Sequence, residues 1–600
     1  MCEIPALAGA DQMSPEREKE FFMETHVIGG GRQWRGVVRS AVMVAILASA
    51  HGARAQTVPA DPDVACTIST ATINSWFKSG TASLNGVVNP ANSVSFPNTP
   101  NCSFYEWSHH MFLWLASPAP AIYGGGGRIF ESSAFFDVTP PDASGKRTMV
   151  PHTGRLLPIL GVFTRQLGPN RLPLVLDKQG RVFEVAPSAA PTARVQTAAG
   201  RLTEIGNVRI DKQRVILLDK AGTAIAPRLL APPAPADAAS RRNAPIARIQ
   251  KFVVNKVPIF IDQAGNLIEV EQGEADGSVL IAQNGSPIYY GIAVNEVMAY
   301  FRTMQGPSVP SGLIFPTTQG ELDTITTFAS AHGRTFIDPE ALAFEIKTAW
   351  IETTGLANPG DYITMSADIP TYDKSNSQHW VKNGHKTATV ALVGMHVVGS
   401  TTGHPEMIWA TFEHLGNAPD DAYSYRNSIG GTTNVPQSTA GSWLFTSAGS
   451  AGPFNVSHGS VSGADIVAAI PGTPIGPDNI IRHKAWGAAS DVSPNPLKNS
   501  AASNSEIISV NNSVRGVLAA GDVRKNYIMT GSTWLIAGSF PFSSFNTTQV
   551  GTSKLSNTSM ETFTQGSGTV ASGTLNCFSC HPAGKTADVS HVFSDLKPLF

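Results

Sequence analysis

The feature that most constrains this chain is a pair of cysteines three residues apart, followed directly by a histidine, close to the C-terminus. Cys577, Cys580 and His581 form the pattern C-x-x-C-H, and 19 residues follow His581. On one turn of helix the two thiols share a face and the imidazole comes next to them. Since so short a tail is far below the size that folds alone, the segment must be integrated into the large upstream body.

The C-x-x-C-H pattern is typical of covalent c-type haem attachment. Each thiol can form a thioether to a haem vinyl group, and the adjacent imidazole can bind the iron as the fifth ligand. A zinc half-site would need a second pair of ligands, and the other two cysteines after residue 55, Cys66 and Cys102, are 36 residues apart. A thioredoxin-like pair normally opens a helix within a βαβ unit, whereas a Gly/Ser/Thr-rich stretch precedes Cys577. We therefore predict one covalently attached haem c.

The sixth iron ligand, if there is one, must come from the short tail or from the body. His396 lies in an apolar run, where a buried imidazole needs a hydrogen bond or a metal; a satisfied core histidine is the alternative. Met560 lies 17 residues before Cys577, although methionine is more often a core residue. His591 is close in sequence, but ten residues is a short connection to the opposite face of the ring. Three further histidines rank lower: His109, His110 and His414.

The first 55 residues have the pattern of a secretory signal peptide. Three arginines, at 32, 35 and 39, precede the apolar run 40–50, and residues 53–55 (ARA) have the form of a cleavage site. We expect cleavage near Ala55 and a periplasmic or secreted protein. An uncleaved anchor is the alternative, but the run is shorter than the roughly 18 residues that a membrane span needs. No later stretch reaches that length, so we expect no membrane span in the mature chain.

The remaining cysteines and the charge agree with this interpretation. Cys66 and Cys102 are natural disulfide partners in an oxidising compartment, with two independent buried thiols as the alternative. The formal net charge is −2 and no basic run is present, which argues against a nucleic-acid partner.

Periodicity and turn residues predict an α+β fold with a β-rich and loop-rich body. Four segments between residues 171 and 291 repeat an apolar strand, a polar turn with glycine at the same offset, and a second strand, so each predicts a β-hairpin. They start at Leu172, Arg214, Val257 and Ser278. We divide the chain into a leader (1–55), the N-terminal part of the body (56–170), a hairpin-rich insertion (171–291), the main body (292–570) and a short helical haem-attachment segment (571–600).

Individual elements follow from local signals. The spacing of Trp107, Met111 and Trp114 predicts a short amphipathic helix. Asp338-Pro339-Glu340 resembles a helix start, and predicts a helix over the following residues to Trp350. Residues 387–398 are apolar and β-branched, which predicts a buried strand. Residues 420–570 are rich in Gly, Ser, Thr and Asn and read as long loops with short strands.

From residue 340 to its end the chain resembles a family of exported bacterial proteins known as cytochrome c family proteins, in which a large body ends in one haem motif. The resemblance rests on segments 343–350 (AFEIKTAW), 391–398 (ALVGMHVV), 408–419 (IWATFEHLGNAP) and 557–563 (NTSMETF), and on CFSCH followed by SHVF in 577–593. It implies haem c binding through Cys577, Cys580 and His581, and electron transfer as the activity.

Three functions fit the sequence. The first is an exported monohaem cytochrome that passes single electrons between periplasmic redox partner proteins. The second is a haem-dependent oxidoreductase, peroxidase- or oxygenase-like, with an open distal site and a small-molecule redox substrate. The third is a binding or sensing protein with a structural haem.

Overall fold

The computed structural model describes residues 58–97, 101–140, 142, 146–152, 174–177, 182–187, 192–211, 214–230, 247–254, 257–268, 270–271, 278–438, 441–462, 465–469, 472–487, 500–540, 549–552, 557–563, 577–581, 586–590 and 592–600. Every structural statement below concerns these residues. The predicted leader with its cleavage site near Ala55 and the candidate ligand His591 lie outside them.

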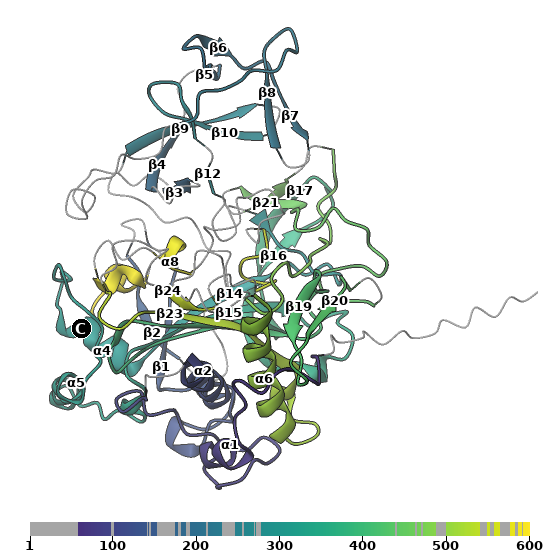
Figure 1. Ribbon diagram of the computed structural model, residues 1–600. Helices are drawn as coiled ribbons and strands as arrows, with labels where there is room; N and C mark the ends of the chain where they lie inside the picture. Colours follow the sequence, from purple (N-terminus) through teal and green to yellow (C-terminus); the bar gives the residue numbers. More distant parts are fainter. Residues whose placement is uncertain are drawn as a thin grey trace, which may run out of the picture. The chain divides into compact units, whose positions relative to one another are not determined.

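The core of the molecule is a large antiparallel sheet, in which twelve strands are connected (Figure 1). Its central strands are β14 (Tyr289–Asn295), β15 (Phe344–Glu352), β17 (His379–Thr401), β18 (His404–His414) and β23 (Tyr527–Leu535). The remaining strands are β1 (Phe135–Val138), β2 (Met149–Pro151), β13 (Ser278–Val279), β16 (Thr364–Asp373), β21 (Gly459–Ser462), β22 (Asp465–Ala468) and β24 (Gln549–Gly551). A separate hairpin joins β19 (Tyr423–Arg426) to β20 (Thr432–Val435).

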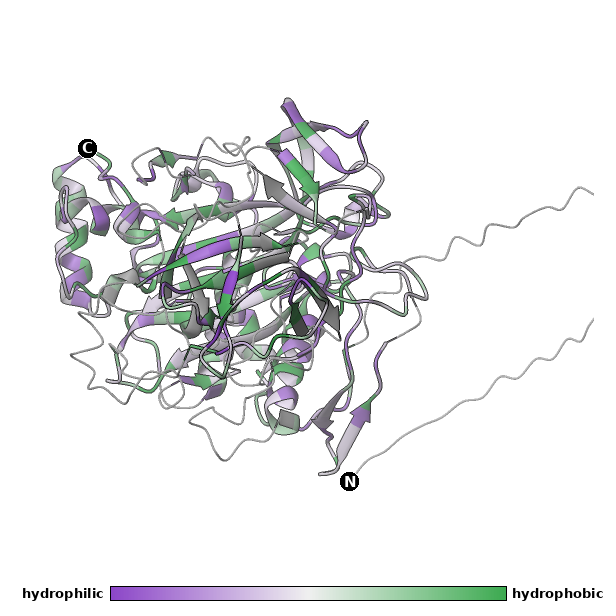
Figure 2. Cartoon of the chain, turned by 90° about the horizontal axis from the view of Figure 1, so that it is seen from above, coloured by the Kyte–Doolittle hydropathy of each residue, from purple (hydrophilic) through white to green (hydrophobic). Residues whose placement is uncertain are grey.

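The predicted buried strand at 387–398 is confirmed as the second half of β17. The run is mostly apolar and β-branched; residues 390–398 are buried except for the half-buried His396, whereas 387–389 are exposed or half-buried. Hydrophobic residues gather along the central strands and on the neighbouring helices (Figure 2). A strand-rich α+β architecture is therefore the fold of this chain.

The prediction of a helix after Asp338-Pro339-Glu340 is wrong. Residues Pro339–Ala341 form one 3-10 turn (η3), and Leu342 then takes a φ of 57°, which ends the helical geometry. The following residues form strand β15: Phe344 and Ile346 are buried, Glu345 and Lys347 are partly exposed, and residues 348–351 are all buried. The period of two in FEIK is the sequence signal of a strand, and it outweighs the start signal in front of it.

Two helices pack on one face of the large sheet. The predicted helix around Trp107, Met111 and Trp114 is confirmed as α2 (Asn101–Leu115), and all three side chains are buried. The second helix, α6 (Ser500–Val517), corrects the prediction of only loops and short strands in 420–570. Shorter helices are α1 (Thr70–Trp76), α4 (Glu296–Met304), α5 (Gln319–Ala331) and α8 (Cys577–Cys580), and 3-10 turns are η1 (Ala121–Tyr123), η2 (Ile129–Glu131), η4 (Pro359–Asp361), η5 (Val523–Asn526), η6 (Thr586–Val589) and η7 (Phe593–Asp595).

Helix α6 is hard to recognise in the sequence because it is rich in serine and asparagine, which favour turns and caps. In the structure several of them form hydrogen bonds: the Ser505 and Ser513 hydroxyls donate to the carbonyls four residues before them, and Asn511 bridges to the Met529 carbonyl on β23 at 2.8 Å. The apolar residues Ile507, Ile508, Val510 and Val514 form a buried stripe at helical spacing.

The hairpin-rich region forms a second, six-stranded sheet with the order β11-β10-β9-β4-β3-β12. Its strands are β3 (Leu174–Asp177), β4 (Val182–Pro187), β9 (Ala247–Val254), β10 (Val257–Ile261), β11 (Leu267–Ile268) and β12 (Val270–Glu271), and two small hairpins pair β5 (Arg194–Gln196) with β6 (Leu202–Glu204) and β7 (Asn207–Asp211) with β8 (Arg214–Leu218). The turn glycines Gly222, Gly265 and Gly285 have φ values of 82°, 84° and 78°, the left-handed conformation expected of these turns. The fourth predicted hairpin leads into β14 and so contributes to the large sheet.

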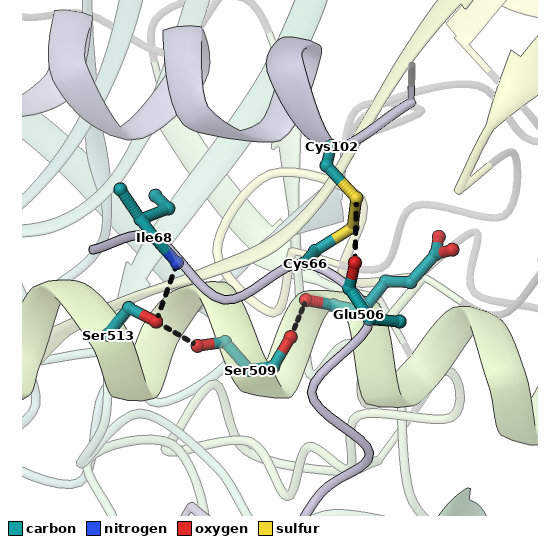
Figure 3. Close-up of a disulfide and its surroundings, with 7 residues drawn as sticks. Cys66, Ile68, Cys102, Glu506, Ser509 and Ser513 are labelled. Atoms are coloured by element: carbon teal, nitrogen blue, oxygen red, sulfur yellow. Dashed lines mark hydrogen bonds between the residues drawn. A yellow bond between two sulfur atoms is a disulfide. The ribbon is translucent and has the colours of Figure 1, made fainter. Parts of the chain in front are cut away.

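Cys66 and Cys102 form a disulfide, with their Cα atoms 5.1 Å apart (Figure 3). It joins the first described segment of the chain to the start of α2, and Ile68 N donates to Ser513 Oγ of α6 beside it. The predicted pairing is confirmed. No described helix is long and apolar enough to cross a membrane.

We expect the double variant C66S/C102S to lose about 2 to 4 kcal/mol of unfolding free energy, since the bond closes a loop of 36 residues and restricts the unfolded chain. Urea unfolding followed by tryptophan fluorescence would measure this. Dithiothreitol should lower the stability of the wild type to that of the variant and leave the variant unchanged; a variant as stable as the oxidised wild type would contradict the expectation.

Candidate functional site

The C-x-x-C-H motif forms a single helical turn. Helix α8 runs from Cys577 to Cys580, and the His581 amide donates to the Cys577 carbonyl at 2.8 Å, which continues the turn. The side chain of Cys577 is half-buried. The side chain of Cys580 lies outside the described residues.

The orientation of the His581 imidazole is fixed by one backbone contact. Its Nδ1 lies 2.9 Å from the carbonyl oxygen of Val589. Because a carbonyl only accepts, Nδ1 must carry the hydrogen, and the lone pair of the neutral ring is then on Nε2. Histidines that bind metals usually donate their other ring nitrogen to such a carbonyl. This donor set, two thiol positions and an oriented imidazole on one turn, fits haem c.

The register of the large sheet shows which of its residues share a face. Directly opposed residues of an antiparallel pair point to the same side, and the register opposes Val398 to both Glu345 and Trp409. One step along β17, His396 is opposed to Lys347 and Thr411. These six side chains therefore form one face, which we call the motif face: Glu345, Lys347, His396, Val398, Trp409 and Thr411.

The C-terminal segment packs on the motif face, on the opposite side of the sheet from α2 and α6 (Figure 1). The Trp409 ring lies 4.3 Å from the His581 ring and 6.1 Å from Phe578, centre to centre. Phe578 is completely buried. The Trp409 indole is held in turn, because its Nε1 donates to the Glu406 carbonyl at 2.8 Å. The motif is thus anchored on the body.

Backbone hydrogen bonds hold the rest of the tail. Ala587 N donates to the Leu313 carbonyl at 2.8 Å, and Arg147 N donates to the Asp595 carbonyl at 2.9 Å. The buried guanidinium of Arg302 donates to the Phe593 carbonyl at 3.1 Å. The tail therefore has several attachments to the body besides the ring contacts of the motif.

His396 is bound by a carboxylate. Its Nε2 lies 2.8 Å from Glu561 Oε1, and the two side chains are 14% and 19% exposed. The sequence prediction placed His396 in a buried run and gave no partner for it; Glu561 is 165 residues away in the sequence. Since this carboxylate takes Nε2, the pair has the form of an oriented acid–base couple.

Met560 is a core side chain. It is 2% exposed and packs in an apolar cluster with Tyr290, Val393 and Ile480, whereas Phe578 belongs to a different cluster. The turn that carries it is rigid: Asn557 Nδ2 donates to Thr411 Oγ1 and to the Phe412 carbonyl, both at 2.8 Å. The turn thereby brings the Glu561 carboxylate into contact with the His396 imidazole. This is the structural role of the segment NTSMETF.

The three lower-ranked histidines lie in structural settings. Both ring nitrogens of His414 are engaged, by the Asp361 carbonyl at 3.2 Å and the Gly416 amide at 3.0 Å. His110 Nε2 contacts the Asn89 carbonyl at 2.9 Å. His109 is buried against Phe412 on the α2 side of the sheet, and burial lowers its pKa to about 3.

Glu345 is the titratable group of the motif face with the clearest shift. Burial raises its pKa to about 7, against the opposing effects of the Ser590 hydroxyl and of the positive charges of Arg147 and Lys347. His396 acts in the same direction as these charges. A carboxyl group that changes charge near neutral pH thus lies beneath the C-terminal segment.

Within the described residues, no group of three or more His, Cys, Asp or Glu side chains is placed to hold a metal ion. A porphyrin brings four nitrogen ligands of its own, so haem requires no such group from the chain. No protein-family model, curated protein or solved structure matches this chain.

Proposed function

We propose that this protein is an exported monohaem c-type cytochrome, which binds one haem c through Cys577, Cys580 and His581 and passes single electrons between redox partners outside the cytoplasm. The observation that supports it best is the His581 Nδ1 contact to the Val589 carbonyl, which puts the hydrogen on Nδ1 and the lone pair on Nε2, the nitrogen that would bind the iron. The resemblance of residues 340–600 to exported cytochrome c family proteins agrees with the proposal.

The residues around the motif have defined parts in this function. The thiols of Cys577 and Cys580 would hold the haem by thioether bonds, and His581 would bind its iron. When bound, haem iron supplies one-electron chemistry by cycling between the ferric and ferrous states. Trp409 packs beside the imidazole, Phe578 packs against Trp409, and the two rings would shield that side from water. Exclusion of water and a fixed ligand both limit the rearrangement that electron transfer would otherwise require.

Export is part of the proposal. The leader pattern in residues 1–55 directs it, and the Cys66–Cys102 disulfide is of the kind that forms in oxidising compartments. We propose a periplasmic or secreted location on these two grounds.

A second candidate is a haem-dependent oxidoreductase, and the His396–Glu561 pair favours it. A partly exposed imidazole held by a carboxylate is suited to accept and return a proton. In this function the pair would serve a small substrate such as peroxide or dioxygen on the motif face.

Absorption spectra of the purified protein separate the two functions. We expect the ferric and ferrous spectra of an electron carrier to be low-spin and to stay unchanged when imidazole or carbon monoxide is added. A high-spin iron that binds either ligand would reject the carrier and favour the oxidoreductase. The variants H396A and M560L, recorded in parallel, show whether either side chain reaches the iron: loss of the low-spin spectrum in one of them identifies the sixth ligand.

A further inference from the structure

A carboxylate on the large sheet accepts a hydrogen bond from a residue of the C-terminal tail. The residue before it in the tail is the one whose carbonyl orients the motif histidine. Ser590 Oγ donates to Glu345 Oε2, across 245 residues of sequence. Ser590 directly follows Val589, whose carbonyl receives the His581 Nδ1 hydrogen. Val589 thus contacts the imidazole, and the next residue, Ser590, contacts strand β15.

We propose that Glu345 is a positioning residue for the His581 imidazole: through Ser590 it fixes the Val589 carbonyl, and through its charge it sets the reduction potential of the attached haem. The inference rests on the proposed function. It assigns a role to a residue of strand β15, outside the C-x-x-C-H motif.

The geometry supports a positioning role. The Val589 carbonyl can orient His581 only if its peptide plane is held, and the Ser590 hydroxyl bonded to Glu345 is a side-chain anchor directly at that plane. Ser590 is 1% exposed, so water cannot easily replace the carboxylate as its partner. Outer partners of this kind are known to tune the ligands that they hold.

The charge of Glu345 predicts the direction in which the reduction potential of the haem changes. A negative charge on the face that carries the motif would favour the more positive ferric state of an attached haem, so ionisation of Glu345 would lower the reduction potential. The charged groups that face it are Arg147, Lys347 and His396, and Glu561 is bound to His396. Because its pKa is raised to about 7, the midpoint potential should fall as the pH rises through neutrality.

The experiment compares the mature, haem-loaded wild type with E345Q, S590A and E352Q. Glu352 is the last residue of the same strand but binds Lys386 Nζ at 2.6 Å in a partly exposed position, so E352Q is the matched control. Haem content is measured by intact mass, and the midpoint potential by redox titration between roughly pH 6 and 8. We expect E345Q to retain haem, to have a more positive potential above neutral pH, and to lose the pH dependence.

S590A removes the anchor and leaves the carboxylate in place. We expect an altered ferric spectrum and a shifted potential with pH dependence retained, and E352Q should match the wild type in every measurement. Haem-loaded E345Q with the potential and pH dependence of the wild type would overturn the inference and leave the proposed function intact. If E345Q cannot be produced as a folded protein, S590A is the deciding variant. A spectrum and a midpoint potential of S590A equal to those of the wild type would then overturn the positioning role. A wild type without haem would reject the proposed function, and this inference with it.

Discussion

The double variant C577S/C580S should fold and carry no covalently bound haem. Serine hydroxyls do not form the thioether bonds that the two thiols supply, and His581 alone cannot hold a haem through denaturation. The side chain of Cys577 is half-buried on a short turn, so its replacement changes little of the core. Haem-dependent peroxidase staining of a denaturing gel, with circular dichroism for the fold, measures both parts of the expectation.

The matched control for this variant is C66S/C102S, which also lacks two cysteines but leaves the motif intact. It should retain the haem stain despite its lower stability. Staining of C577S/C580S equal to that of the wild type would show that haem is attached elsewhere or not through these thiols.

The second large effect is expected from Arg482, which is completely buried between two carboxylates. Its guanidinium contacts Glu413 and Asp420, which are 0% and 2% exposed. The variant R482M leaves both carboxylates buried without a counter-charge, and removal of one partner from such a pair costs about 3 to 5 kcal/mol. We expect a loss of this size in the unfolding free energy from urea denaturation.

The effect should extend to the motif face. Glu413 also accepts hydrogen bonds from the Thr558 amide and hydroxyl, and so holds the turn that places Glu561 on His396. The control is R426M, because Arg426 Nε lies 3.6 Å from Asp63 on the surface and its loss should cost less than about 1 kcal/mol. Equal stabilities of R482M and R426M would contradict the assigned role of the buried group.

The sequence predicted the elements whose own residues carry a clear period. Trp107, Met111 and Trp114 mark α2 because they recur at helical spacing, and the largely apolar, β-branched run 387–398 marks β17 because a strand buried on both faces needs few polar residues. The disulfide followed from two cysteines and the expected compartment, without any structural information.

Local signals failed where tertiary packing decides the conformation. The Asp-Pro-Glu start ahead of β15 makes a single turn because the residues after it gain more by pairing with β14 and β17 than by forming a helix. Helix α6 was missed because it is rich in serine and asparagine, several of which form hydrogen bonds within the helix or to β23. Both outcomes depend on partners distant in sequence.

The same limit applies to the site. The spacing within 577–581 identified the motif because its chemistry is local, but the partners Val589, Glu345 and Glu561 could not be found in this way. Glu345 and His396 stand on neighbouring strands, and only the register brings them to the face that carries the tail. The only sequence signal for Glu345 or His396 is that each is a polar residue inside a largely buried strand.

The most direct test of the account is the intact mass of the mature wild-type protein, measured under denaturing conditions after expression with export and cytochrome c maturation. We expect the mass of the processed chain plus that of one haem, together with the visible absorption of a c-type haem. A colourless protein whose mass equals that of the bare processed chain would contradict the central claim.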